Sequence, residues 1–253
     1  MDAMSAYQAE LNRQVPGFDG LVEPDVVLSA IGLPVARANS ANAARFTADS
    51  ADSRIDAVIA WFEARRLPFV WHLGPADQPS DLGERLKARG FTVSPDEMPG
   101  MVARLGALPE PELPADASLE RVGNLESFRA WLGVVVAGFE MPAIMGETFL
   151  KFGGLGFGPG MPDLLLARLD GRPIATALAA VVGGGVVITN VTTLPDARGR
   201  GLGRAITLAA MRHGAEAGAA IAVLQSSEMG YRVYRGLGFE DFGRYRSLLR
   251  SDD

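Results

Sequence analysis

The 253-residue sequence predicts an α/β (α+β) protein with a mixed sheet and flanking helices. Two observations support this fold class. Strand-like segments at 163–169, 173–182 and 186–194 follow one another with tight turns between them, which is typical of an antiparallel meander. A glycine-rich turn, a helix and a further strand come next, and this order favours a right-handed crossover between parallel neighbours.

Glycines predict the turns of the meander. Asp170-Gly171 forms one turn, and the triplet Gly183–Gly185 forms the next, at the middle of a charge-free run from Pro173 to Pro195. That run is long enough to suggest a membrane span. Three glycines would weaken a helix, so two strands with a tight turn are the preferred interpretation, and no membrane partner is expected.

Helices and strands alternate through the rest of the C-terminal part. The predicted elements are a strand near 118–122, a helix from about 125 to 139, a helix from 204 to 217, a strand at 220–225, a helix from about 229 to 236 and a last strand at 245–249. Residues 140–162 are rich in glycine, proline and methionine. They are expected to be irregular and to shape the substrate site.

The N-terminal part resembles a weaker copy of this plan. Its predicted elements are strands at 25–31, around 37–46 and at 68–73, a helix at 53–66 and a short helix that ends in Gly-Phe at 90–91. The segment Leu82–Phe91 parallels Gly230–Phe239, with Leu86 in the place of Tyr234. A degenerate internal repeat and a chance match both explain this similarity. The proline-rich segment Leu108–Pro114 reads as a linker, so domains are predicted at 1–112 and 117–253.

Composition excludes several classes of function. The chain has no cysteine, which removes disulfides, thiolate metal sites and cysteine nucleophiles, and which agrees with a cytoplasmic location. The N-terminus does not read as a signal peptide. The net charge of -6 argues against a nucleic-acid partner. His72 and His213 stand without a second histidine or a carboxylate at ligand spacing, so they are interpreted as structural and no metal is predicted.

The segment from Arg198 to Arg204, Arg-Gly-Arg-Gly-Leu-Gly-Arg, is the most informative part of the chain. Its glycines allow the backbone to approach a ligand closely, and the helix that follows would offer unpaired amides and a positive dipole end. Three arginines add charge at the same place. A pyrophosphate group suits this turn, whereas a solvated helix start is the plainer alternative.

Residues 117 to 250 resemble the GCN5-related N-acetyltransferase (GNAT) superfamily. The pyrophosphate signature of that family, Gln/Arg-x-x-Gly-x-Gly/Ala, stands here as Arg198-Gly-Arg-Gly201-Leu-Gly203, and a second signature stands as Tyr234-Arg-Gly-Leu-Gly238-Phe239. The resemblance implies the acyl-CoA N-acyltransferase fold, in which a mixed sheet splays open to hold acetyl-CoA. It also implies that two such units stand in tandem, with the N-terminal one degenerate.

The resemblance further implies a role for each matching residue. The pyrophosphate would be bound by the turn, that is by Arg198, Gly199, Arg200, Gly201, Leu202, Gly203 and Arg204. The pantetheine arm would pair with the backbone of Val191, Thr192 and Thr193, and a strand amide near Val191 would stabilise the oxyanion. Ser227 stands where many members carry an asparagine that contacts the arm. Tyr234 would protonate the departing thiolate.

The expected reaction is the direct transfer of an acetyl or other acyl group from acetyl-CoA to an amine of a small molecule or a peptide. Glu140, Asp163 and Glu228 all remain candidates for the general base. A non-catalytic acyl-CoA sensor is the alternative function. A dinucleotide or nucleotide site is a weak third reading, because Rossmann glycine spacing and a Gly-Lys-Ser/Thr sequence are both missing. The oligomeric state, monomer or homodimer, stays open.

Overall fold

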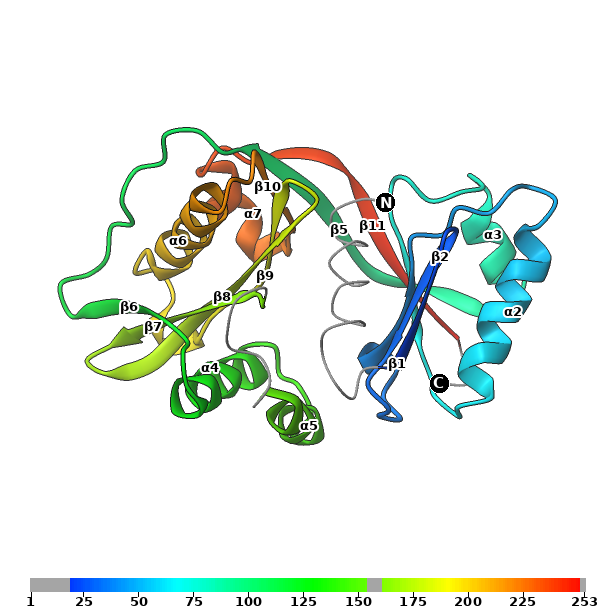
Figure 1. The fold of residues 1–253 in the computed structure, drawn as a ribbon, viewed down its shortest axis with the longest axis horizontal. Coiled ribbons are helices and arrows are strands. Elements are labelled where there is room, and N and C mark those ends of the chain that lie inside the picture. The colour runs from blue at the N-terminus through cyan, green and yellow to red at the C-terminus, as the bar shows by residue number, and fades with distance from the viewer. Residues whose placement is uncertain (1–18, 154–160, 251–253) are drawn as a thin grey trace. The chain divides into compact units, whose positions relative to one another are not determined.

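The computed structural model describes residues 19–153 and 161–250 and divides into two compact units. Unit 1 takes its described residues from Met1–Gly100 and Phe242–Asp253, and unit 2 consists of Met101–Asp241. Two long strands are divided between them: β5 (Phe91–Arg104) and β11 (Glu240–Arg250). Each unit is an α/β structure with helices against a mixed sheet (Figure 1).

The sheet of unit 2 confirms the predicted meander and crossover. Its neighbouring strands run in the order β6 (Ala117–Arg121), β7 (Asp163–Leu169), β8 (Arg172–Val182), β9 (Gly185–Thr193) and β10 (Ile221–Gln225), with the end of β5 beyond β10. The pairs from β6 to β9 are antiparallel, and β9 and β10 are parallel. Gly183 and Gly184 form the β8–β9 turn with φ values of 59° and 79°, a conformation that suits glycine. Within the described residues, no helix is long and apolar enough to cross a membrane.

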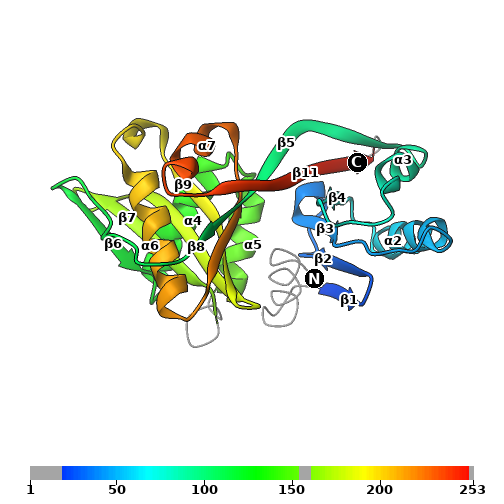
Figure 2. The same ribbon diagram turned by 90° about the horizontal axis from the view of Figure 1, so that it is seen from above.

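Helices cover both faces of this sheet (Figure 2). The helix α4 (Leu125–Gly138) lies against one face and α6 (Leu202–Glu216) lies against the other. Asn124 caps α4, because its side chain accepts a hydrogen bond of 2.8 Å from the backbone amide of Ser127. The shorter elements are α5 (Ala143–Gly153), the 3-10 turn η2 (Pro195–Ala197) and α7 (Glu228–Arg235).

The expectation that residues 140–162 are irregular is wrong for the part that forms α5. This helix packs on α4 at Gly146, where an added Cβ would lie 2.9 Å from a methyl group of Val136. The glycine that lowered the helical signal in the sequence therefore serves close helix packing. Residues 154–160 of the same segment lie outside the described residues.

Unit 1 contains its own meander and crossover. The elements are β1 (Asp19–Glu23), β2 (Val26–Ala30), η1 (Ala36–Ala38), β3 (Asn39–Asn42), α2 (Ala51–Glu63), β4 (Val70–Leu73) and α3 (Leu82–Lys87). The strands β3 and β4 are parallel neighbours connected through α2, and β4 pairs with Arg246–Leu249 of β11. The strand expected around 37–46 is shorter than predicted, because η1 replaces its first residues. The strand β5 was not predicted, since Pro95 and Pro99 within it argue against a continuous strand.

Candidate active site

The arginine- and glycine-rich turn comes between β9 and α6, as predicted, but the short turn η2 precedes it and α6 begins at Leu202 instead of Arg204. Gly199 and Gly201 have φ values of 77° and 81°, in the left-handed region that favours glycine. An added Cβ at either glycine would meet no atom within 4 Å, so the turn is open. Gly201 is the N-cap of α6 and supplies no side-chain cap, and the first turn of α6 has no acidic residue. The first amides of this helix are therefore available to an anion.

The three arginines of the turn are exposed but held in place by neighbouring groups. The Nε of Arg198 donates to the carbonyl of Thr193 at 3.0 Å, and Arg200 forms an ion pair of 3.0 Å with Asp116. Arg204 donates to the carbonyl of Gly236 at 2.9 Å and so connects α6 with the end of α7, the helix of Tyr234. Positive charge is thus concentrated around the amides of the turn.

The strand that leads to this turn separates from its parallel neighbour. The β9–β10 register pairs Gly185–Val187 with Ile221–Val223, and β9 then continues through Thr193. Along this last part, the edge of β9 that faces away from β8 lies beyond its pairing with β10, which ends at Val187. An extended ligand with amide groups suits such an edge, since backbone donors and acceptors repeat along it.

A β-bulge interrupts β9 at Asn190. Thr176 of β8 pairs with Thr192 and Leu178 pairs with Thr189, so two residues of β9 lie opposite the single residue Ala177. Asn190 has a φ of 52°, which asparagine tolerates better than most residues. Sequence reasoning missed this bulge. The only feature of the sequence that could have indicated the bulge is Asn190 itself, which interrupts a run of β-branched residues.

The side chain of Thr192 lies close to Gly138, at the end of α4. An added Cβ at Gly138 would come within 2.2 Å of the Thr192 hydroxyl and 2.7 Å of its methyl group. The lack of a side chain at Gly138 is therefore what permits α4 to approach this part of β9. Neither residue was assigned this contact from the sequence.

Tyr234 is buried in the core of unit 2. Its side chain packs edge-on against Phe239, with ring centroids 5.9 Å apart, and it lies over Gly230 one turn earlier in α7. Burial raises the pKa of Tyr234 to about 12. The hydroxyl therefore stays protonated through the neutral range and is able to donate a hydrogen bond or a proton.

Ser227 is the N-cap of α7. Its hydroxyl accepts a hydrogen bond of 3.2 Å from the amide of Gly230. A serine hydroxyl keeps a proton to donate while it accepts, so this capping role leaves it one donor for a ligand. Capping also fixes the start of the helix that carries Tyr234.

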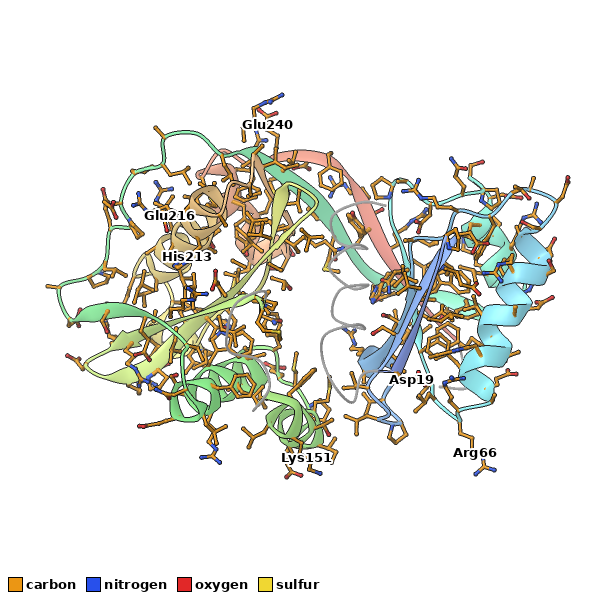
Figure 3. All side chains as sticks on the ribbon, viewed as in Figure 1. Asp19, Arg66, Lys151, His213, Glu216 and Glu240 are labelled. Atoms are coloured by element: carbon orange, nitrogen blue, oxygen red, sulfur yellow. The ribbon has the colours of Figure 1, made fainter. Side chains whose placement is uncertain are left out.

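The candidate bases are placed differently from one another. Asp163 forms an ion pair with Arg121, and the Nδ1 of His213 lies 3.7 Å from the Asp163 carboxylate. His213 projects from α6 (Figure 3), and the structural role expected for it stays a prediction. Glu140 and Glu228 are both exposed, the first after α4 and the second in the first turn of α7. These contacts argue against Asp163 as the base and do not single out one of the two glutamates.

His72 lies on β4 in unit 1, where its Nδ1 is 3.0 Å from the Ser247 hydroxyl. Burial, with a smaller contribution from Arg37, lowers the pKa of His72 to about 4, so its ring is neutral at pH 7. Among the residues that the structure describes, no group of three or more metal-ligating side chains gathers.

The site thus combines an open turn, whose helix amides suit an anion, with a strand that separates from its neighbour and carries a bulge. Residues 147–239, which include this turn and this strand, match the model of the Acetyltransferase (GNAT) family. This segment contains both signatures and the whole of β7 to α7. No functionally curated protein matches the chain.

Solved structures share the fold across nearly the whole chain. A GCN5-related N-acetyltransferase from Kribbella flavida aligns with a TM-score of 0.77 at 22% identity, over 99% of this chain and 96% of the other. A GCN5-related N-acetyltransferase from Sphaerobacter thermophilus aligns with a TM-score of 0.67 at 20% identity, over 91% and 82%. A tandem GNAT protein from the clavulanic acid biosynthesis pathway aligns with a TM-score of 0.60 at 16% identity, over 94% and 85%. The match of residues 147–239 to the family model supports an acyltransferase, and the solved structures show the fold that this chain shares with GCN5-related N-acetyltransferases.

Proposed function

We propose that the protein transfers an acetyl group from acetyl-CoA to an amine of a small molecule or a peptide. The open turn at Gly199 and Gly201, with the uncapped first amides of α6 behind it, carries this proposal. A pyrophosphate carries the negative charge that unpaired helix amides and nearby arginines attract. The pantetheine arm then lies along Val191–Thr193, where β9 has left β10.

The reaction consists of addition and elimination at the thioester carbon. A neutral amine attacks the carbonyl carbon, a C–N bond forms, and the oxygen gains negative charge that the amide of Val191 stabilises. The nitrogen then loses its extra proton to Glu140, Glu228 or water, the C–S bond breaks, and the hydroxyl of Tyr234 donates a proton to the leaving sulfur. The pKa of about 12 is high for a proton donor, but a thiolate in the same desolvated site is also more basic than in water.

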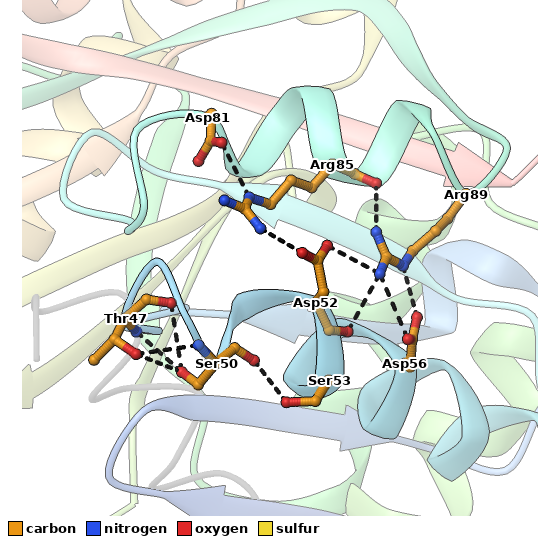
Figure 4. A network of polar contacts seen from close by, with 8 residues as sticks. All are labelled: Thr47, Ser50, Asp52, Ser53, Asp56, Asp81, Arg85 and Arg89. Carbon is orange, nitrogen blue, oxygen red and sulfur yellow. Dashed lines mark hydrogen bonds and ion pairs between the residues drawn. The ribbon is translucent and has the colours of Figure 1, made fainter.

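Unit 1 is proposed to be a degenerate copy of unit 2. The elements β3, α2, β4 and α3 follow one another as β9, α6, β10 and α7 do, and both strand pairs are parallel. At the start of α2, however, Thr47 and Ser50 exchange hydrogen bonds of 3.2 Å between each side chain and the other's backbone amide (Figure 4). Asp52 adds a negative charge in the first turn. Polar side chains and an acidic residue thus stand at the start of α2, where unit 2 has glycines and arginines, so acetyl-CoA is assigned to unit 2 alone.

A charge reversal at the turn tests this assignment. The substitution Arg198→Glu places a carboxylate beside the pyrophosphate and should weaken the binding of CoA at least tenfold, about 1.4 kcal/mol, in calorimetric titration. Arg129→Glu is the matched control, because Arg129 is exposed on α4 and the change in net charge is the same. Equal CoA affinity in the two variants would contradict a pyrophosphate site at the turn.

The chemistry is tested separately on the unsubstituted protein. Release of free thiol from acetyl-CoA, measured with a panel of small amines and peptides, should exceed the rate of hydrolysis for at least one acceptor. Parallel titrations with ATP and NAD should show weaker binding than CoA. Tight binding of acetyl-CoA without turnover on any amine would favour a sensor instead.

A further inference from the structure

Two buried side chains hold the bulge of β9 in its conformation. The hydroxyl of Thr176 donates to the carbonyl of Asn190 at 2.8 Å, and the indole Nε1 of Trp131 donates to the carbonyl of Ala177 at 3.2 Å. Thr176 is fully buried and Trp131 is 5% exposed. One acceptor is the carbonyl of Asn190, within the bulge, and the other is the carbonyl of Ala177, the residue of β8 opposite the bulge.

The first of these bonds determines where the next amide points. In a trans peptide, the C=O and N–H groups point in opposite directions. Thr176 on β8 draws the carbonyl of Asn190 toward β8, so the N–H of Val191, in the same peptide unit, points toward the other edge of β9. That edge is the one that β10 leaves after Val187.

The second bond stabilises the partner strand. A bulge removes a ladder hydrogen bond, and a buried carbonyl without a donor is destabilising. Trp131 donates from α4 to the carbonyl of Ala177, the residue of β8 that lies opposite the bulge, and so helps to fix this part of β8. The same helix approaches Thr192 through Gly138, so α4 supports both sides of the bulge.

We infer that Thr176 and Trp131 are positioning residues, which aim the Val191 amide at the oxygen of the thioester. This inference rests on the proposed function and deepens it. Neither side chain touches the acyl donor in this assignment. Both act through the backbone of β8 and β9, and Thr176 has the more direct effect because its partner belongs to the same peptide unit as the Val191 amide.

Two substitutions at Thr176 separate a role of the hydroxyl from a role of the side-chain volume. Thr176→Val keeps the shape and removes the hydroxyl, whereas Thr176→Ser keeps the hydroxyl and removes a methyl group. We expect Thr176→Val to lower the rate of thiol release at saturating acetyl-CoA about tenfold or more, with the affinity for CoA within twofold. Thr176→Ser should restore most of the rate, although its melting temperature falls, since it leaves a small cavity. Trp131→Phe should lower the rate in the same direction and by less.

A spectroscopic readout removes the dependence on an acceptor. The amide ¹H–¹⁵N signal of Val191 should shift more on addition of acetyl-CoA than on addition of CoA, because only the former has the carbonyl. In Thr176→Val this difference should shrink, and in Thr176→Ser it should persist. A Thr176→Val protein with wild-type rate and signal difference, or a Thr176→Ser protein more impaired than Thr176→Val, would overturn the inference. Failure of the wild-type protein to bind acetyl-CoA would instead overturn the proposed function, and the inference with it.

Discussion

At the scale of single residues, Tyr234 combines burial with a group that can supply a proton. The ring is fixed by Phe239 and Gly230, so the hydroxyl has little freedom and any function depends on where the backbone of α7 places it. The substitution Tyr234→Phe keeps this packing and removes the hydroxyl alone. If the hydroxyl protonates the leaving thiolate, the turnover number should fall by about 10² or more, since general acid catalysis contributes that much. The affinity for CoA, measured by titration, should change little.

The rate of Tyr234→Phe needs a second variant for its interpretation. Tyr231 lies in the same helix, is half-buried and packs against the same core, so Tyr231→Phe removes a hydroxyl from a comparable place. Its turnover should stay near that of the wild-type protein. Equal turnover in Tyr234→Phe and wild type would exclude Tyr234 from the mechanism and leave water as the proton donor.

The burial of Tyr234 also predicts a dependence of stability on alkaline pH. Its pKa is about 12 in the folded protein against 10.0 for an unperturbed tyrosine, so the folded state binds more protons than the unfolded state between these values. The free energy of unfolding therefore falls as the pH rises from 10 to 12, by about 2 to 3 kcal/mol from this residue. Denaturant unfolding followed over this range should show a smaller decrease in Tyr234→Phe. An identical decrease in both proteins would mean that the hydroxyl is solvated in the folded state.

At the scale of elements, the sequence predicted the meander, the crossover helix and the anion-binding turn, because each has a local cause. Glycines at Gly183 and Gly184 determine a hairpin turn, and Gly201 followed by an apolar helical pattern determines a helix start. The bulge at Asn190 has no such local cause. It depends on donors from Thr176 and Trp131, which lie 14 and 59 positions away in the sequence.

The missed elements have the same explanation. The helix α5 contains Gly146, which allows close packing against α4 and so favours this position only in the folded protein. The strand β5 contains two prolines that local rules exclude from a central strand. Tertiary contacts outweigh local propensity in both cases, and these are also the contacts that build the surroundings of the site.

The contact of α4 with β9 leads to a prediction about glycine. Gly138→Ala should lower the melting temperature and the turnover number, because its Cβ would lie 2.2 Å from the Thr192 hydroxyl and the helix must move away. Gly133→Ala is the matched control in the same helix, where an added Cβ meets no atom within 4 Å. It should be neutral or stabilise the protein by up to about 1 kcal/mol.

A compensating substitution makes this prediction sharper. Thr192→Ala removes both atoms that Gly138→Ala would strike, so the double variant should recover stability relative to Gly138→Ala. Thermal melting of the four proteins gives the coupling energy between the two positions. A coupling energy near zero would show that α4 does not depend on this contact.

At the scale of the whole molecule, the two compact units do not follow the order of the chain. Met101 and Ala103 are buried in the core of unit 2, and the amide of Leu105 donates to the carbonyl of Ala220 at 2.9 Å. These residues precede the proline-rich segment that marks the predicted boundary between 1–112 and 117–253. The end of β5 is thus part of the hydrophobic core that supports the candidate site.

This arrangement predicts that a fragment of residues 101–253 is more stable than one of residues 117–253. The two share their C-terminus, but the shorter fragment lacks the buried Met101, and burial of such a side chain contributes about 1.5–3 kcal/mol. It also lacks Asp116, the ion-pair partner of Arg200. Thermal melting and CoA titration of both fragments measure the effect on the core and on the turn.

Met101→Ala in the longer fragment should reproduce much of the loss in stability, because Met101 is 0% exposed, while it leaves Asp116 in place. Equal melting temperatures for the two fragments would mean that the independent domain begins at the linker, as the proline-rich segment suggests.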